Sequence, residues 1–228
     1  KYWFFKEQIP FLMWEVWVNN IRSAENPIPL NKQIINTICI LFIGIILGIF
    51  SKLLDTMPTN ELPFIFEFLD MRNFLGRFAI WLLIALSISI YSNSSIRASI
   101  NVFVFFVGMV TSYYLYSKFV AGFFSRSYAM IWVTFTVISP ILAFICWYAR
   151  GKSKLAFMLS ATILAVLFNT TFVHVGSYFE MRSILELITF LFAVVFLKRK
   201  AIKDTMIMLA LSVGIAFALD FVVPFHFG

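Results

Sequence analysis

Charged residues are scarce in this sequence. Asp, Glu, Lys and Arg make up 13% of the 228 residues, where soluble domains carry about 25%. Hydrophobic residues reach 61% and the mean hydropathy is +0.92. A water-soluble fold of this length has no means of burying that much apolar surface. The composition therefore excludes a soluble globular domain and indicates an all-α polytopic membrane protein.

The sequence also lacks the motifs of common enzyme classes. It contains no HExxH, no Gly-x-Ser-x-Gly and no Walker sequence. The two histidines, His174 and His226, and the two cysteines, Cys39 and Cys146, do not have the spacing of metal ligands. We therefore predict no metal, no cofactor and no catalytic residue. A membrane-embedded enzyme that modifies lipids is the least favoured alternative.

Apolar runs long enough to cross a bilayer follow one another along the chain. We predict seven spans, at residues 34–54, 74–91, 99–120, 128–149, 155–173, 183–197 and 205–225. The sixth is short and carries Glu186, so six spans plus a re-entrant or surface helix is the alternative. Residues 1–30 contain Trp3, Trp14 and Trp17 among charges and predict an interfacial amphipathic helix. Residues 31–228 then form a single transmembrane domain.

Basic residues lie mainly at the ends of these apolar runs. The formal net charge is +7, which in a soluble domain would point to nucleic acid, but here membrane topology explains it. Twelve of the 18 Lys and Arg residues fall on one set of loops, including residues 150–154 and 198–200, and six on the other. The positive-inside rule therefore predicts a multi-pass protein of the cell membrane with a cytoplasmic N-terminus. We predict the lipid bilayer as a partner and no nucleic acid.

A short sequence echo suggests an internal repeat. Residues 69–75 (LDMRNFL) resemble residues 179–185 (FEMRSIL), and each segment stands just before a predicted span, the second and the sixth. Three spans, one connecting span and three further spans would place the two triplets in the same orientation. This arrangement predicts a parallel repeat, and binding sites of such proteins often lie between the halves.

Several charged residues cluster at the predicted outer ends of the spans. Ionisable groups within spans usually face a protein interior or a water-filled cavity. We predict a funnel that binds substrate and is lined by Asp70, Arg72, Arg77, Glu180, Arg182, Glu186 and Asp220. Arg77 and Glu186 occupy nearly equivalent positions in the two triplets and are one candidate ion pair. Arg182 and Glu186, four residues apart, are another. The alternative is a ring of interfacial ion pairs that fixes the helix ends.

Other residues point to helix packing. Gly44 and Gly48 form a GxxxG motif, which predicts close helix approach and favours a homodimer as one candidate. Asn101 and Asn169 lie within spans, where amide side chains usually form hydrogen bonds between helices.

Two functions compete on these observations. The first is a bacterial-type membrane transporter, or the substrate-binding membrane subunit of one, for a small polar or anionic molecule at an outward-facing site. The second is a non-catalytic membrane partner, such as an assembly, immunity or sensing subunit that acts through helix contacts. The first depends on the repeat and the charged funnel. The second depends on the GxxxG motif, the predicted surface helix and the absence of any charge near the bilayer centre.

Overall fold

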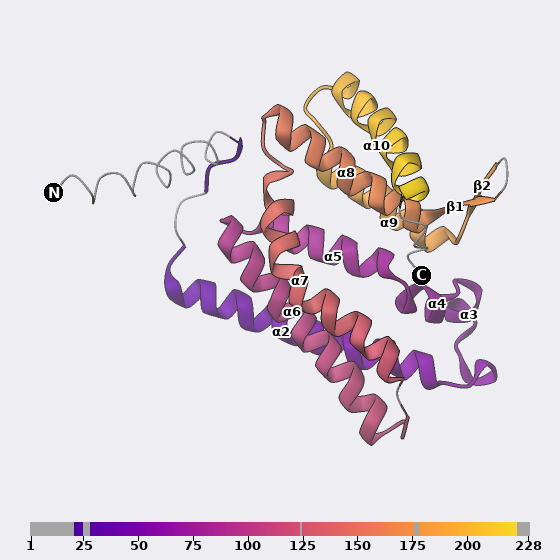
Figure 1. Ribbon diagram of the computed structural model, residues 1–228. Coiled ribbons are helices and arrows are strands. Elements are labelled where there is room, and N and C mark those ends of the chain that lie inside the picture. Colours follow the sequence, from indigo (N-terminus) through magenta and orange to yellow (C-terminus); the bar gives the residue numbers. More distant parts are fainter. Residues whose placement is uncertain (1–20, 25–27, 124, 176–177, 223–228) are drawn as a thin grey trace.

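The computed structural model describes residues 21–24, 28–123, 125–175 and 178–222, and it is built from helices that run back and forth between two ends of a bundle (Figure 1). The interfacial helix predicted within residues 1–30 lies mostly outside the described residues. The expected helical fold is confirmed for the described residues, and several of its helices are long and apolar enough to cross a membrane.

Five helices are long and apolar enough to cross a membrane. They are α2 (Leu30–Thr56), α6 (Ser95–Phe119), α7 (Arg126–Tyr148), α8 (Lys154–Thr171) and α10 (Ile202–Val222). Two shorter apolar helices, α5 (Phe78–Tyr91) and α9 (Ile184–Leu197), have 14 residues each. A helix of that size is about 21 Å long, less than the hydrocarbon core of about 30 Å. The number of seven complete spans therefore stays a prediction.

The predicted second span is broken at its start. Residues 74–76 belong to a separate short helix, α4 (Met71–Gly76), and the chain is extended at Arg77 (φ −96°, ψ 166°) before α5 begins. The short helices η1 (Thr59–Glu61) and α3 (Phe64–Phe68) precede α4 at the same end of the bundle. The connection between α2 and α5 is therefore itself folded into short helices.

The predicted fifth span ends early, at Thr171. The following residues form strand β1 (Phe172–Val175), which pairs antiparallel with β2 (Tyr178–Met181) and places Val173 opposite Glu180. β-branched and aromatic residues favour strands, which explains the change from helix. The described fold is therefore helical with one small hairpin at the end that also holds α3 and α4.

Serine residues fix the starts of three helices. The side chains of Ser94, Ser153 and Ser183 each accept a hydrogen bond from the backbone N–H three residues later, at the first turns of α6, α8 and α9. Such caps satisfy N–H groups that have no partner within the helix. They set the points at which the chain turns back into the bundle.

The closest helix contact joins α2 and α6. A Cβ atom added to Gly44 or Gly48 would collide with the α6 backbone at Phe105 and Met109, and one added to Gly108 would lie 2.8 Å from Leu41 O. The predicted packing role of the GxxxG motif is confirmed. The motif acts within the chain, so the close face is already occupied and does not supply a homodimer contact.

Polar side chains reinforce these helix pairs. Thr37 Oγ1 donates to Asn101 Oδ1 over 2.9 Å and joins α2 to α6, and Asn169 Nδ2 donates to Ala216 O over 2.9 Å and joins α8 to α10. The prediction that both asparagines form bonds between helices is confirmed. An unpaired polar group in hydrocarbon is energetically unfavourable, and these hydrogen bonds between helices avoid that penalty.

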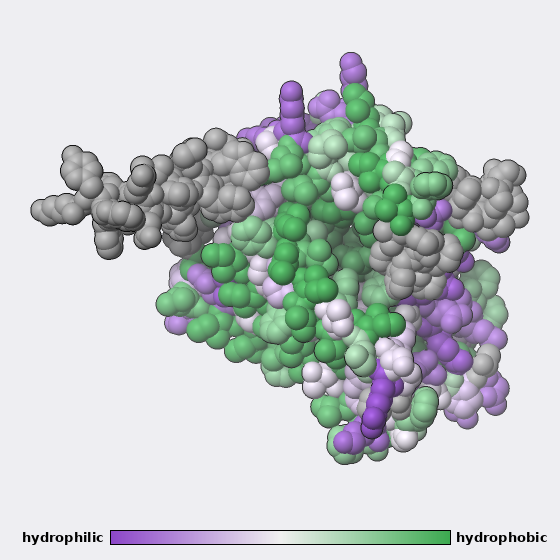
Figure 2. All heavy atoms as spheres, viewed as in Figure 1, coloured by the Kyte–Doolittle hydropathy of each residue, from purple (hydrophilic) through white to green (hydrophobic). Residues whose placement is uncertain are grey.

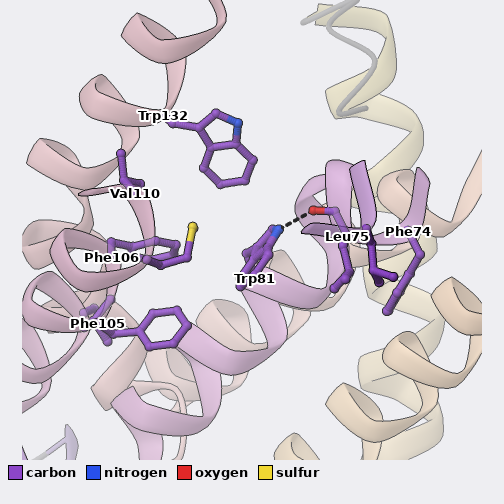
Figure 3. Close-up of a cluster of buried hydrophobic side chains, with 11 residues drawn as sticks. Phe74, Leu75, Trp81, Phe105, Phe106, Val110 and Trp132 are labelled. Atoms are coloured by element: carbon purple, nitrogen blue, oxygen red, sulfur yellow. Dashed lines mark hydrogen bonds between the residues drawn. The ribbon is translucent and has the colours of Figure 1, made fainter. Parts of the chain in front are cut away.

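Two hydrophobic clusters divide the bundle. The first lies among α2, α4, α5, α6 and α7, and Figure 3 shows its aromatic centre. The second lies among α5, α8, α9 and α10, together with the end of α7. α5 contributes side chains to both clusters, and it packs against α6 and α7 on one side and α8 and α9 on the other. α5 is therefore the central helix that joins the two halves.

The two predicted triplets pack in different orders. In the first, α6 lies between α2 and α5, so the third helix of the triplet is in the middle. In the second, α8 lies between α10 and α9, so the first helix is in the middle. These contacts give no support to a parallel repeat.

Charge differs strongly between the ends of the bundle. One end, the basic end, carries Arg22, Lys32, Arg97, Arg150, Lys152, Lys154, Lys198, Arg199, Lys200 and Lys203, with Asp204 as the acidic residue described there. The other, the mixed-charge end, carries six basic and seven acidic described residues. Between the ends the surface is mostly apolar, as the green face in Figure 2 shows.

Arginines at the basic end also complete helix termini. Arg22 donates to Ile90 O at the end of α5 and to Trp147 O at the end of α7. Arg199 donates to Ala149 O and Gly151 O just after α7. Terminal carbonyls lack partners within their own helix, and they attract cations. These arginines therefore hold loops together as well as setting topology.

A candidate ligand-binding cavity at the mixed-charge end

A cavity of about 290 Å³ lies at the mixed-charge end between α2, α4, α5, α6 and α7. Its charged lining residues are Lys52 and Asp55 from α2 and Arg72 from α4. Tyrosine and tryptophan side chains from α5, α6 and α7 complete the wall. Charged groups and aromatic rings in one concave space are typical of a small-molecule site.

Lys52 is the central charged group of this cavity. It lies one turn before the end of α2 and is 9% exposed. Its Nζ is 2.6 Å from Asp55 Oδ2 and 5.1 Å from the centre of the Tyr113 ring. The Tyr113 hydroxyl donates to the same carboxylate oxygen over 3.2 Å. The carboxylate and the ring compensate the ammonium charge, which makes its burial tolerable.

Arg72 links the cavity wall to the end of α2. Its Nε donates to Leu54 O over 3.2 Å, and its Nη2 donates to Met57 O. Both acceptors are carbonyls at the C-terminal end of α2, where a cation is favoured. A guanidinium group has five N–H donors, so these two bonds leave further donors on a side chain that lines the cavity.

Aromatic side chains close the cavity toward the middle of the bundle. The Trp81 and Trp132 rings are 6.4 Å apart, edge to face, and Trp81 Nε1 donates to Leu75 O over 2.9 Å (Figure 3). One turn deeper on α6, Phe105 and Phe106 are fully buried. The cavity therefore has an aromatic floor and opens at the mixed-charge end, where the Asp55 side chain is 46% exposed.

The predicted funnel residues do not gather in one place. Arg72 is the one among the seven that lines this cavity, as far as the structure describes its walls. Arg77, Arg182 and Glu186 form a second charged cluster between α5 and α9. Asp70, Glu180 and Asp220 do not line the cavity and are not part of the Arg77–Glu186 ion pair.

The second cluster contains the predicted ion pair. Arg77 Nη1 donates to Glu186 Oε1 over 2.9 Å, and Glu186 is fully buried while the Arg77 side chain is 25% exposed. Arg77 stands just before α5 and Glu186 in the first turn of α9, so the pair ties the starts of the two short helices together. The predicted pairing is confirmed.

Arg182 lies close to this pair. Its backbone N–H donates to Thr171 O over 3.0 Å, which joins the hairpin to the end of α8. Burial lowers the pKa of its guanidinium below the ordinary value, the positive charge of Arg77 lowers it further, and Glu186 acts in the opposite direction. The cluster therefore contains two arginines and one buried carboxylate, so it has a formal excess of positive charge.

Asp70, Glu180 and Asp220 are the remaining predicted residues. Asp70 has a left-handed backbone (φ 50°) before α4 and accepts a hydrogen bond from Asn73 Nδ2 over 2.8 Å. Glu180 is exposed on β2, and Asp220 is partly exposed near the end of α10. That all seven residues bind one substrate stays a prediction.

Sequence reasoning missed Lys52, Asp55, Tyr113 and Tyr128. A Lys and an Asp three residues apart at the end of an apolar run were a usable signal, because such residues face the same side of a helix. Nothing in the sequence placed Tyr113 beside them, since that contact depends on how α2 packs against α6. Tyr128, at the start of α7, donates to Gly76 O over 2.9 Å and closes the remaining side of the cavity.

In the described part of the chain, no three His, Cys, Asp or Glu residues lie close enough together to hold a metal ion. No protein-family model, curated protein or solved structure matches the chain. The cavity is therefore the main indication of function.

Proposed function

We propose that this protein binds a small anionic or polar molecule in the cavity at its mixed-charge end, as a membrane transporter or as the substrate-binding membrane subunit of one. The observation that carries the proposal is the buried Lys52, held by Asp55 inside an aromatic-walled cavity that Arg72 also lines. A lysine is costly to bury, and a binding role accounts for that cost.

The charges of the cavity favour a carboxylate or phosphate group. Lys52 and Arg72 supply two positive charges and Asp55 supplies one negative charge, so the cavity has a formal excess of one positive charge. Arginine donors bind planar oxyanions in bidentate fashion. The aromatic walls suit a small organic body or an ammonium group beside the anion. The volume of about 290 Å³ is at the lower end of ligand pockets, which limits the ligand to a small molecule.

The direction of access follows from the distribution of charge. The positive-inside rule assigns the basic end to the cytoplasm, so the mixed-charge end faces outward in the cell membrane and the N-terminus is cytoplasmic. With the aromatic floor closed, this form corresponds to an outward-open state. Transport then requires movement of Trp81 and Trp132 away from the path.

Ligand-dependent stability tests the binding proposal. The purified protein is heated with a panel of small carboxylates, phosphates and amino acids, and the unfolding midpoint is recorded. A ligand at about 100 times its Kd stabilises the folded state by about 2.7 kcal/mol, enough to raise the midpoint measurably. Lys52→Met should abolish that shift. Lys118→Met is the matched control, because Lys118 is exposed at the end of α6 and does not line the cavity.

A second candidate function is a membrane partner that binds the ligand without moving it. The specific observation in its favour is the closed floor, in which Phe105 and Phe106 fill the path below Trp81 and Trp132. Uptake of the identified ligand into vesicles that contain the purified protein separates the two. Binding with uptake supports a carrier, and binding without uptake supports a sensing or substrate-binding subunit. Absence of any stabilising ligand, with normal folding, would reject both versions of the cavity proposal.

A further inference from the structure

A second cavity of about 250 Å³ lies in the middle of the bundle among α5, α6, α7 and α8. Its wall is almost wholly apolar, with Leu86, Phe106, Ala143 and Leu167 from the four helices. Leu142 and Ile145 stand at its rim on α7, and each is 41% exposed. We call it the α7–α8 groove. Figure 2 shows the apolar surface on this side, hollowed between the two helices.

The groove exists because α7 and α8 pack loosely against each other. α7 contacts α6 along much of its length, and α8 packs mainly against α10 and α9. Figure 1 shows α8 lying apart from α7 beyond the loop that joins them. A space that opens sideways from the middle of a membrane bundle faces acyl chains, because no water is available there to fill it.

The groove leads toward a cluster of positive charge. Cys146 lines it only four residues before Arg150, a distance of about 6 Å along a helix. Arg150 and Lys152 are exposed in the loop between α7 and α8, and Lys154 is exposed as the first residue of α8. Arg199, from the next loop, donates to Gly151 O over 2.7 Å and adds a further positive charge beside them. An apolar groove with a basic cluster at one end matches one acyl chain and one anionic headgroup.

We propose that the α7–α8 groove binds an anionic phospholipid from the leaflet at the basic end. One acyl chain enters the groove, and the phosphate group lies against Arg150, Lys152 and Lys154. Basic clusters beside a membrane surface attract anionic lipids, and the groove adds a fixed place for the chain. This site shares no lining residue with the cavity at the mixed-charge end.

Lipid titration followed by native mass spectrometry tests the headgroup part. The full protein is titrated with phosphatidylglycerol and with phosphatidylcholine of the same chains. Lys152→Gln with Lys154→Gln should lower the apparent affinity for phosphatidylglycerol by about 30-fold, as expected for two surface lysines. Lys32→Gln with Lys203→Gln is the matched control, because it removes the same charge at the basic end on α2 and α10. An equal loss in both double variants would overturn the proposal.

Filling the groove tests the chain part. Leu142→Trp should lower retention of phosphatidylglycerol, whereas Ile141→Trp should not, since Ile141 is 64% exposed on the same helix and does not line the groove. In vesicles, phosphatidylglycerol with a photoreactive acyl chain should label the segment around Cys146 more than photoreactive phosphatidylcholine does, with equal labelling on α2. Equal labelling of the groove by both lipids, or unchanged retention in Leu142→Trp, would contradict a specific anionic-lipid site.

Discussion

The ion pair between Arg77 and Glu186 gives the sharpest test of how the two halves are joined. Glu186 is fully buried, and Arg77 Nη1 lies 2.9 Å from its Oε1. Removing one member of a buried pair costs about 3–5 kcal/mol, because the other charge is left without its partner. Since the charge of Arg182 also acts on Glu186, we expect Arg77→Met to fall at the low end, with a loss of about 3 kcal/mol.

The double variant Arg77→Met with Glu186→Met should recover much of this loss. Replacing a buried pair with apolar residues of similar size is often neutral, so we expect a coupling energy of about 2 kcal/mol between the two sites. Exchanging the two charges is a weaker test, because Glu186→Arg would place a second buried arginine beside Arg182. The free energy of unfolding is measured by denaturant titration in mixed micelles. If each single variant lowered the free energy of unfolding by less than about 0.5 kcal/mol, and the double variant showed the sum of the two effects, the pair would not stabilise the fold.

Three further predictions concern packing, loop structure and topology. Gly48→Ala should destabilise the protein by about 1–3 kcal/mol through overpacking against α6, whereas Gly214→Ala, with open space around it, should be tolerated in the same unfolding assay. Arg199→Gln should lower the free energy of unfolding by about 2 kcal/mol, because buried carbonyl groups lose a charged hydrogen-bond donor. Lys200→Gln, at an exposed position, should leave the midpoint of unfolding unchanged. A cysteine replacing Lys200 should resist an impermeant thiol reagent in intact cells while one replacing Asn60 reacts, and the reverse pattern would invert the topology.

The helices were predictable because lipid imposes a simple requirement on sequence. A helix forms all its backbone hydrogen bonds within itself and exposes apolar side chains to lipid. Such a segment is recognisable by its length and composition alone. The pairing of Arg77 with Glu186 was accessible for a related reason, since two opposite charges near the starts of two apolar helices have few other partners. The break at Arg77 and the early end of α8 were not accessible, because helix boundaries depend on local turns that composition does not encode.

The sequence echo shows why local likeness is weak evidence for a repeat. Met71 and Arg72 begin the short helix α4, whereas Met181 ends strand β2 and Arg182 follows it. The second segment is extended because it pairs with Phe172–Val175, which has no counterpart in the first half. Contacts with neighbouring segments of the same chain therefore decide the backbone conformation of two similar sequences.

The ligand cavity could not be derived from the sequence, because it depends on a contact between distant residues. Lys52 counts as one more basic residue near a helix end until α2 packs against α6 and brings Tyr113 over it. That packing requires Gly44 and Gly48, and their motif indicates that some helix approaches closely without indicating which one. The charge pattern thus pointed to the end of the molecule that holds this cavity, and the close packing at the glycines determines which residues line it.

α5 connects the two proposed sites through its own side chains. Trp81 forms part of the cavity floor, while Leu82 and Leu86 on the same helix line the α7–α8 groove. The helix is short and is anchored at its start by the pair of Arg77 with Glu186. Any shift of α5 that moved Trp81 from the floor would also move the wall of the groove. A lipid that binds the groove more tightly in this form than in the shifted form would therefore stabilise the closed floor.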